Sequence, residues 1–163
     1  MSPQKSCRHQ FAVHNEAETA AFGELLGRLL TPGLVIALVG DLGAGKTRLV
    51  QAIVATAIGT EVDVTSPTFV LIHEYAGPEL VIYHFDAYRL KDVDEFLDLG
   101  VEESFHADNV CIVEWADKVP EAFRGDVLWI RVVITGPETR TMEIVGTGER
   151  SCEVVGKIAG LIN

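Results

Sequence analysis

The chain has 163 residues, which suits one domain, and 24 acidic against 13 basic residues give it a formal charge of −11. This charge repels polyanions, so we expect no surface that grips nucleic acid or an anionic membrane unaided. A hydrophobic fraction of 48% supplies material for a core and argues against a disordered chain. The longest apolar runs, such as 34–39, have about six residues, whereas a membrane-spanning helix needs roughly 20.

The three cysteines, Cys7, Cys111 and Cys152, are odd in number and far apart. They show no Cys-x-x-Cys spacing, so we expect neither a disulfide framework nor a zinc site. The N-terminus lacks the apolar segment and the cleavage site of a signal peptide. We therefore expect a cytoplasmic protein.

In chain order, the first half predicts a strand at 11–13, a helix at 16–30, a strand at 34–39, a helix at 46–58 and a strand at 62–64. The first helix begins after Asn15, an N-cap residue with Glu18 three positions later. The run 34–39 is apolar throughout and rich in branched residues. That pattern is typical of a strand buried on both faces of a parallel sheet.

The second half predicts strands at 70–75 and 80–85, a helix at 93–99, strands at 110–113, 127–135 and 141–145, and a helix at 153–161. The turn at 76–79 joins the first two of these strands as an antiparallel hairpin. Asp92 caps the short helix, and Gly100 ends it.

Between the strand at 34–39 and the next helix lies a glycine-rich loop that matches the P-loop pattern, with the residues Gly40, Asp41, Leu42, Gly43, Ala44, Gly45, Lys46 and Thr47. The glycines let the backbone curl so that successive N–H groups and the helix N-terminus cradle phosphates. Lys46 is expected to reach the β and γ phosphates, and Thr47 to bind Mg²⁺ through its hydroxyl. The loop therefore predicts a site for a nucleoside triphosphate with magnesium.

These elements together predict an α/β fold, a single P-loop NTPase domain spanning residues 1–163. Its β-sheet is mixed but mainly parallel, is flanked by helices and carries one antiparallel hairpin.

Acidic residues follow two apolar strands at positions that suit a magnesium site. Asp86 comes directly after the strand at 80–85, and Glu114 directly after the strand at 110–113. The carboxyl ends of parallel strands face the nucleotide crevice, so both are candidate metal ligands and catalytic groups. Asp41, inside the loop, is a third candidate. The alternative is that each is an ordinary surface carboxylate.

Three further positions have a functional and a structural interpretation. The segment 65–69, Thr-Ser-Pro-Thr-Phe, is either a switch that senses the γ phosphate or an ordinary turn with self-capping hydroxyls. Trp115 either stacks on the adenine, closes the site or belongs to the core. His84 either steadies Asp86 from the same strand end or is a half-buried polar residue.

Four blocks of this sequence, in their order and separations, resemble the TsaE (YjeE) family of small bacterial ATPases: GDLGAGKT at 40–47, TSPTF at 65–69, HFDAYRL at 84–90 and VEWADK at 113–118. The resemblance implies an ATPase of the machinery that makes N6-threonylcarbamoyladenosine at position 37 of tRNAs. It implies slow hydrolysis alone, TsaD and TsaB as protein partners, and contact with tRNA only indirectly, through that complex.

The resemblance also implies roles for individual residues, with ATP and Mg²⁺ as cofactors. Lys46 matches the lysine that binds phosphate, and Thr47 the threonine whose hydroxyl binds magnesium. Glu114 matches a magnesium or catalytic carboxylate, and Asp86 the acidic residue of the family's H-x-D-x-Y-R block. The remaining matches are Thr68 in the switch-like segment, Trp115 as the aromatic residue beside the nucleotide, and Glu16 near the base. Arg48 departs from the family pattern, which usually has a second threonine there, and we expect its side chain to point away from the site.

Two other functions remain open at this point. A small-molecule kinase would share the strand, loop and helix, although no arginine-rich lid of the kind kinases close over phosphates occurs at 125–163. A non-enzymatic module, in which ATP only orders the switch segment for a partner, is the other.

Overall fold

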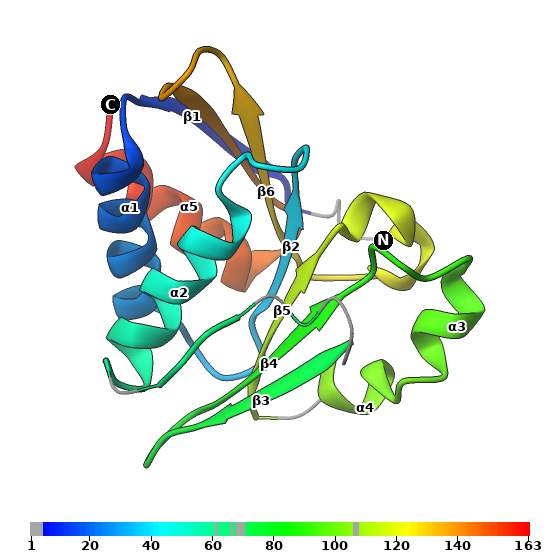
Figure 1. Ribbon diagram of the computed structural model, residues 1–163. Coiled ribbons are helices and arrows are strands. Elements are labelled where there is room, and N and C mark those ends of the chain that lie inside the picture. The colour runs from blue at the N-terminus through cyan, green and yellow to red at the C-terminus, as the bar shows by residue number, and fades with distance from the viewer. Residues whose placement is uncertain (1–4, 61, 66, 68–70, 106–107) are drawn as a thin grey trace.

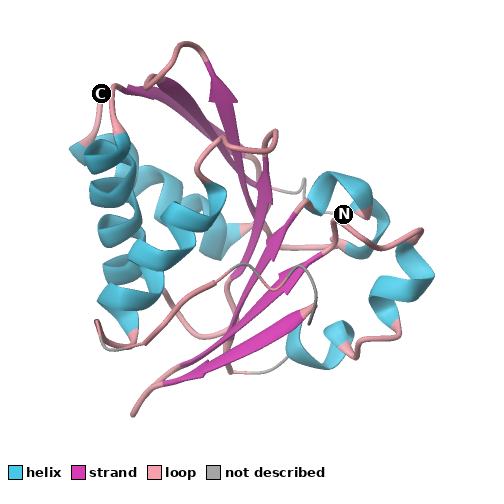
Figure 2. Ribbon diagram, viewed as in Figure 1, coloured by secondary structure: helices cyan, strands magenta, loops and turns pink. Residues whose placement is uncertain are grey.

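The structure is a computed structural model that describes residues 5–60, 62–65, 67, 71–105 and 108–163. Seven strands form one sheet with helices against both faces (Figures 1 and 2). The strands are β1 (Cys7–Val13), β2 (Val35–Val39), β3 (Ile72–Ala76), β4 (Val81–Asp86), β5 (Val110–Glu114), β6 (Leu128–Ile134) and β7 (Arg140–Gly146). The helices are α1 (Glu16–Leu29), α2 (Lys46–Ala57), α3 (Val93–Leu97), α4 (Val101–Phe105) and α5 (Glu149–Leu161), with two 3-10 turns, η1 (Ala116–Lys118) and η2 (Pro120–Ala122).

The strand order is β1-β7-β6-β2-β5-β4-β3. The four central strands, β6, β2, β5 and β4, are parallel to one another, and the outer strands are antiparallel to their neighbours. The predicted α/β P-loop fold with its mixed sheet is confirmed, and so is the β3–β4 hairpin. The parallel centre brings the carboxyl ends of β2, β4 and β5 to one edge, where a nucleotide site is expected in such folds.

The core has two parts, one on each face of the sheet. Alternate residues of β2 divide between them: Ile36 and Leu38 pack under α1, α2 and α5, while Val35, Ala37 and Val39 face α3, α4 and the 3-10 turns. All five are buried. The continuous apolar run that predicted a doubly covered strand is thereby explained.

Helices α1 and α2 pack closely because α1 carries glycines at the contact. A Cβ placed on Gly23 would lie 2.5 Å from the Cβ of Ala52, and one on Gly27 would lie 2.7 Å from the Cβ of Thr56. The predicted N-cap of α1 is confirmed, since Glu18 N donates to Asn15 Oδ1 at 2.8 Å. This packing fixes α2, whose first residues end the P-loop, against α1.

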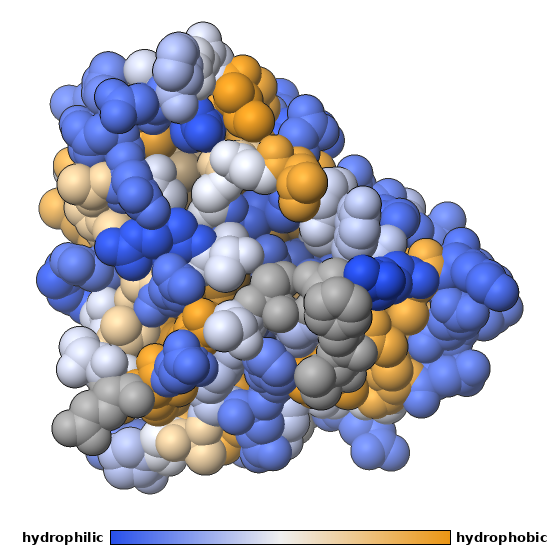
Figure 3. All heavy atoms as spheres, in the orientation of Figure 1, coloured by the Kyte–Doolittle hydropathy of each residue, from blue (hydrophilic) through white to orange (hydrophobic). Residues whose placement is uncertain are grey.

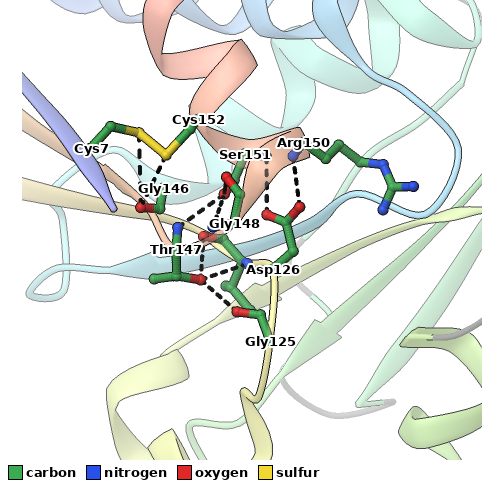
Figure 4. Close-up of a disulfide and its surroundings, with 10 residues drawn as sticks. Cys7, Gly125, Asp126, Gly146, Thr147, Gly148, Arg150, Ser151 and Cys152 are labelled. Atoms are coloured by element: carbon green, nitrogen blue, oxygen red, sulfur yellow. Dashed lines mark hydrogen bonds between the residues drawn. A yellow bond between two sulfur atoms is a disulfide. The ribbon is translucent and has the colours of Figure 1, made fainter. Parts of the chain in front are cut away.

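Two elements differ from the sequence prediction, and strand β1 and helix α5 each begin earlier than predicted, at Cys7 and Glu149. The described residues 62–64 are not a strand; Val62 and Val64 pack against the core from irregular chain. Helix α5 begins at Glu149 rather than 153, because Asp126, distant in sequence, accepts hydrogen bonds from Arg150 N and Ser151 N at its first turn (Figure 4). Helix α4 was not predicted.

The expectation that no cysteines pair was wrong. Cys7 of β1 and Cys152 of α5 form a disulfide across a sequence separation of 145 residues (Figure 4). Both sulfur atoms lie near the carbonyl oxygen of Gly146 on β7, at 3.8 and 3.5 Å. The fold pairs these cysteines because α5 returns across the sheet beside its edge strand, which no sequence spacing indicates. Cys111 is a buried thiol.

The surface seen in Figure 3 is largely hydrophilic, with apolar side chains in small patches. Two large apolar residues near the carboxyl ends of the central strands are exposed: Leu42 in the P-loop at 80% and Ile134 at the end of β6 at 44%. Among the described residues, no helix has both the length and the apolar character needed to cross a bilayer.

Candidate nucleotide-binding site

The P-loop connects the end of β2 to the start of α2 at the carboxyl edge of the sheet. Gly43 and Gly45 have φ angles of 80° and 106°, the left-handed region in which glycine carries no steric penalty. Gly40 is needed for another reason, because a Cβ there would lie 2.8 Å from the carbonyl oxygen of Val132 on β6. The predicted roles of these glycines in shaping the loop are consistent with this geometry.

The N-terminus of α2 is open toward this loop. Its N-cap is Gly45, so no side chain caps it, and its first turn contains no acidic residue. The orphan N–H groups and the positive end of the helix dipole are therefore available to an anion. This is the arrangement that suits phosphate groups at a helix start.

Lys46 is buried, with 5% of its surface exposed. Its ammonium group donates to the carbonyl oxygens of Gly40 and Asp41, the latter at 3.2 Å, and lies 3.9 Å from the centre of the Trp115 ring. Loss of hydration on burial lowers the pKa of Lys46, although the carboxylates of Glu114, Asp117 and Asp86 oppose the shift. A bound triphosphate would replace the carbonyl groups as its partner.

Thr47 and Glu114 meet across the site. The hydroxyl of Thr47 donates to Oε1 of Glu114 at 3.3 Å, and Glu114 is 2% exposed. A hydroxyl and a carboxylate oxygen this close are the hard ligands that Mg²⁺ accepts beside phosphate oxygens and water. Among the described residues no cluster of three His, Cys, Asp or Glu side chains could hold a metal alone. The oxygens of Thr47 and Glu114 therefore fit a magnesium ion whose other ligands would include the phosphates of a nucleotide.

Asp86 and Glu114 are register partners at the ends of β4 and β5, and both are buried. Oδ1 of Asp86 accepts a hydrogen bond from Tyr88 N at 2.8 Å, and the Glu114 carbonyl accepts one from Ala87 N. The sequence-based expectation that these two carboxylates converge at one edge of the sheet is confirmed in position. Their roles toward a metal or water remain predictions.

His84 holds Glu114 rather than Asp86. It is fully buried, and its Nε2 donates to Oε2 of Glu114 at 2.7 Å. Its Nδ1 has no hydrogen-bond partner in the part of the chain that the structure describes. Of the two interpretations of His84, neither named Glu114. The signal in the sequence was its alternation with Asp86, which places both side chains on the same face of β4.

Two cavities flank the P-loop. One, of about 340 Å³, is lined by loop residues 42–48 with Tyr88, Glu114 and Trp115. The other, of about 300 Å³, lies beside residues 43–45 and is lined also by Glu16, Thr19, Arg48, Arg140 and the turn between β6 and β7. Trp115 and Glu16, both predicted to lie near the nucleotide, therefore line different cavities.

The remaining predicted residues are placed as follows. Arg48 does not point away from the site: its Nε lies 3.6 Å from Oε1 of Glu16, and it lines both cavities. Asp41 contributes its main-chain carbonyl to Lys46. Leu42, at the tip of the loop, is exposed, while Ala44 is buried. Thr68 lies outside the described residues.

A parallel central sheet, a glycine-rich loop leading from a buried strand into a helix, and buried carboxylates on the neighbouring strands define a P-loop protein. Comparison with known proteins agrees with this class. The family described as threonylcarbamoyl adenosine biosynthesis protein TsaE matches residues 13–142. The chain belongs to the TsaE family, which takes part in tRNA threonylcarbamoyladenosine biosynthesis.

Individual relatives support the same assignment. A tRNA threonylcarbamoyladenosine biosynthesis protein TsaE of Bacillus subtilis is 40% identical over 136 residues, covering 83% of this chain and 84% of that protein. A protein of the same name from Rickettsia felis is 32% identical and covers 85% of this chain and 81% of its own. The crystal structure of YdiB from Bacillus subtilis superimposes with a TM-score of 0.81 at 30% identity, covering 96% of this chain and 97% of the other.

Proposed function

We propose that this protein binds Mg-ATP and hydrolyses it, as the ATPase component of the machinery that makes threonylcarbamoyladenosine in tRNA. The observation that carries the proposal is the contact of Thr47 with Glu114 at 3.3 Å beside the buried Lys46. This contact brings together a hydroxyl group that can bind magnesium, a carboxylate and a cation that can bind phosphate, all at the uncapped N-terminus of α2.

The two cavities give the nucleotide an orientation. The phosphates belong in the cavity lined by Lys46, Thr47 and Glu114, because the cation and the metal ligands are there. The base then belongs on the other side of the loop, in the cavity lined by Glu16 and Arg48. Trp115 consequently lies beside the phosphates and not beside the base.

The chain's own residues would divide the chemistry among them. Lys46 and the loop N–H groups would hold the β and γ phosphates, and Thr47 and Glu114 would hold magnesium. When bound, the metal would supply positive charge against the charge that develops on the transferred phosphoryl group. His84 fixes Oε2 of Glu114 so that Oε1 faces Thr47. Asp86, at the neighbouring strand end, would hold a water molecule of the metal's hydration shell or orient the attacking water.

The partners of the proposed reaction are TsaD and TsaB, with tRNA engaged only through that complex. The charge of −11 supports this division, because the chain itself repels a polyanion. Hydrolysis is proposed to be slow in the isolated chain and to support repeated turnover of the complex.

The test is a reconstitution with TsaD, TsaB, threonylcarbamoyl-adenylate, ATP and tRNA, in which modified tRNA is counted per complex. We expect multiple turnovers with this protein and a single turnover with Lys46→Ala or without the protein. Equal modification with and without the protein would contradict the proposal. Glu114→Gln distinguishes a need for ATP hydrolysis from a need for ATP binding alone. If this variant binds ATP without hydrolysing ATP and still supports full turnover, ATP acts by binding alone.

A further inference from the structure

Arg140, the first residue of β7, bridges the P-loop and the turn between β6 and β7. Its guanidinium donates four hydrogen bonds, all to main-chain carbonyl oxygens. Two acceptors are in the P-loop, Ala44 at 3.1 Å and Gly43 at 3.3 Å, and two are in the turn, Gly136 at 2.9 Å and Thr139 at 2.8 Å. The side chain is half-buried.

The bond to Ala44 determines the direction of a neighbouring N–H group. A trans peptide is planar, with its carbonyl and N–H pointing in opposite directions, and no cis peptide occurs among the described residues. Because the Ala44 carbonyl points to Arg140, the N–H of Gly45 in the same peptide points away from it. Gly45 has a φ angle of 106° and precedes Lys46, so this N–H is one of the donors of the phosphate cradle.

The positive charge of the Arg140 guanidinium also makes the N–H of Gly45 a stronger hydrogen-bond donor. A positive charge at the carbonyl end of a peptide polarises it, which makes the N–H at the other end a better donor to an anion. Lys46 holds the carbonyls of Gly40 and Asp41 in the same loop. When Lys46 turns to a phosphate it releases those carbonyls, whereas Arg140 keeps its own.

We propose that Arg140 is a positioning residue for the P-loop: it holds the Ala44 carbonyl outward so that the N–H of Gly45 faces the phosphates. The N–H of Ala44 itself donates to the carbonyl of Asp41 at 3.0 Å, so Gly45 is the donor on which Arg140 acts. This inference rests on the proposed binding of Mg-ATP. Arg140 also lines the cavity assigned to the base, but its four hydrogen bonds all go to main-chain carbonyls of the protein. The inference therefore predicts that Arg140 acts on the phosphate part of the ligand and leaves recognition of the base unaltered.

The experiment measures the Kd of ATP, tripolyphosphate and adenosine by calorimetry for the wild type, Arg140→Ala and Arg140→Lys. Lysine keeps the charge but cannot bond four carbonyls, so we expect both variants to bind phosphate ligands about tenfold more weakly than the wild type. In each variant the affinities for ATP and for tripolyphosphate should fall by the same factor, and the affinity for adenosine should not change. Arg131→Ala is the matched control. Its guanidinium, on the adjacent strand, is 59% exposed and paired with Glu143 at 3.7 Å, so its removal should alter none of the three.

Thermal unfolding of each variant sets a temperature at which all are folded, and Arg140→Lys serves if Arg140→Ala is too unstable. Variants that bind tripolyphosphate as the wild type does would overturn the inference and leave the proposed function standing. Weaker binding of ATP but not of tripolyphosphate would also overturn it, since Arg140 would then act on the base. A wild-type protein that binds neither ATP nor tripolyphosphate would overturn both proposals.

Discussion

The ammonium group of Lys46, the first residue of α2, lies 3.9 Å from the centre of the ring of Trp115, which directly follows β5. A cation over the face of an indole ring is attracted by its π-electrons. The contact ties the phosphate-binding lysine to an aromatic group that can be observed spectroscopically.

We therefore predict that Mg-ATP changes the fluorescence of Trp115. When Lys46 turns to the phosphates, its charge leaves the indole ring and the ring's environment changes. The measurement is a fluorescence titration of the wild type and of Trp115→Phe, which retains Trp129 as an internal control. A full signal change in Trp115→Phe would show that the signal comes from Trp129 and would contradict the prediction.

Removal of the His84 side chain is predicted to impair hydrolysis more than binding. His84→Leu deprives Glu114 of its 2.7 Å buried hydrogen bond, so the carboxylate is no longer fixed toward Thr47. We expect hydrolysis to fall about tenfold or more, since residues that orient a metal-binding side chain typically contribute about 10- to 100-fold, while His84→Gln retains part of the rate. His73→Leu is the control: His73 is opposite His84 in the register and its ring lies edge-on to that of His84, but its hydrogen bond goes to the Tyr75 hydroxyl. Hydrolysis at the wild-type rate in His84→Leu would show that the contact is structural.

The cysteine pairing predicts a thiol count. Denatured without reductant, the chain should show one reactive thiol, Cys111, and after reduction it should show three. Closing so long a loop stabilises the folded state, so Cys7→Ser with Cys152→Ser should lower the free energy of unfolding by about 2–4 kcal/mol under non-reducing conditions. Reductant should lower the stability of the wild type and leave the double variant unchanged. Three reactive thiols without reductant would contradict the pairing.

Burial raises the pKa of the Cys111 thiol from 9.0 to about 12. Between these pH values the thiol of the unfolded chain loses its proton, whereas that of the folded protein keeps it. The contribution of the neutral Cys111 thiol to the free energy of unfolding is therefore complete below pH 9 and is lost as the pH rises toward 12. We expect the free energy of unfolding to fall over that interval more steeply in the wild type than in Cys111→Ala. The check is denaturant unfolding at stepwise pH. Equal slopes in the two proteins would contradict the assigned burial.

The sequence predicted the parts of this protein whose causes are local. The P-loop, the Asn15 cap and the apolar run of β2 all depend on residues within a few positions of one another, and the structure places each as predicted. Asp86 and Glu114 also followed, because parallel strands share one edge.

What the sequence did not reveal depends on residues brought together by the fold. His84 on β4 reaches Glu114 on the adjacent strand β5. Asp126 caps α5 from another segment, and Cys7 meets Cys152 only when α5 returns to the edge of the sheet. Arg140 joins the P-loop from 96 residues away. Such contacts have no spacing rule in the sequence, so they became visible only in the structure.

The most direct test of this account is a calorimetric titration of the purified protein with ATP in the presence of magnesium, repeated with Lys46→Ala. We predict one site per chain in the wild type, weakened when magnesium is withheld and lost in Lys46→Ala. Absence of ATP binding by the wild type, or equal binding by Lys46→Ala, would contradict the claim that the P-loop, Thr47 and Glu114 form a site for Mg-ATP.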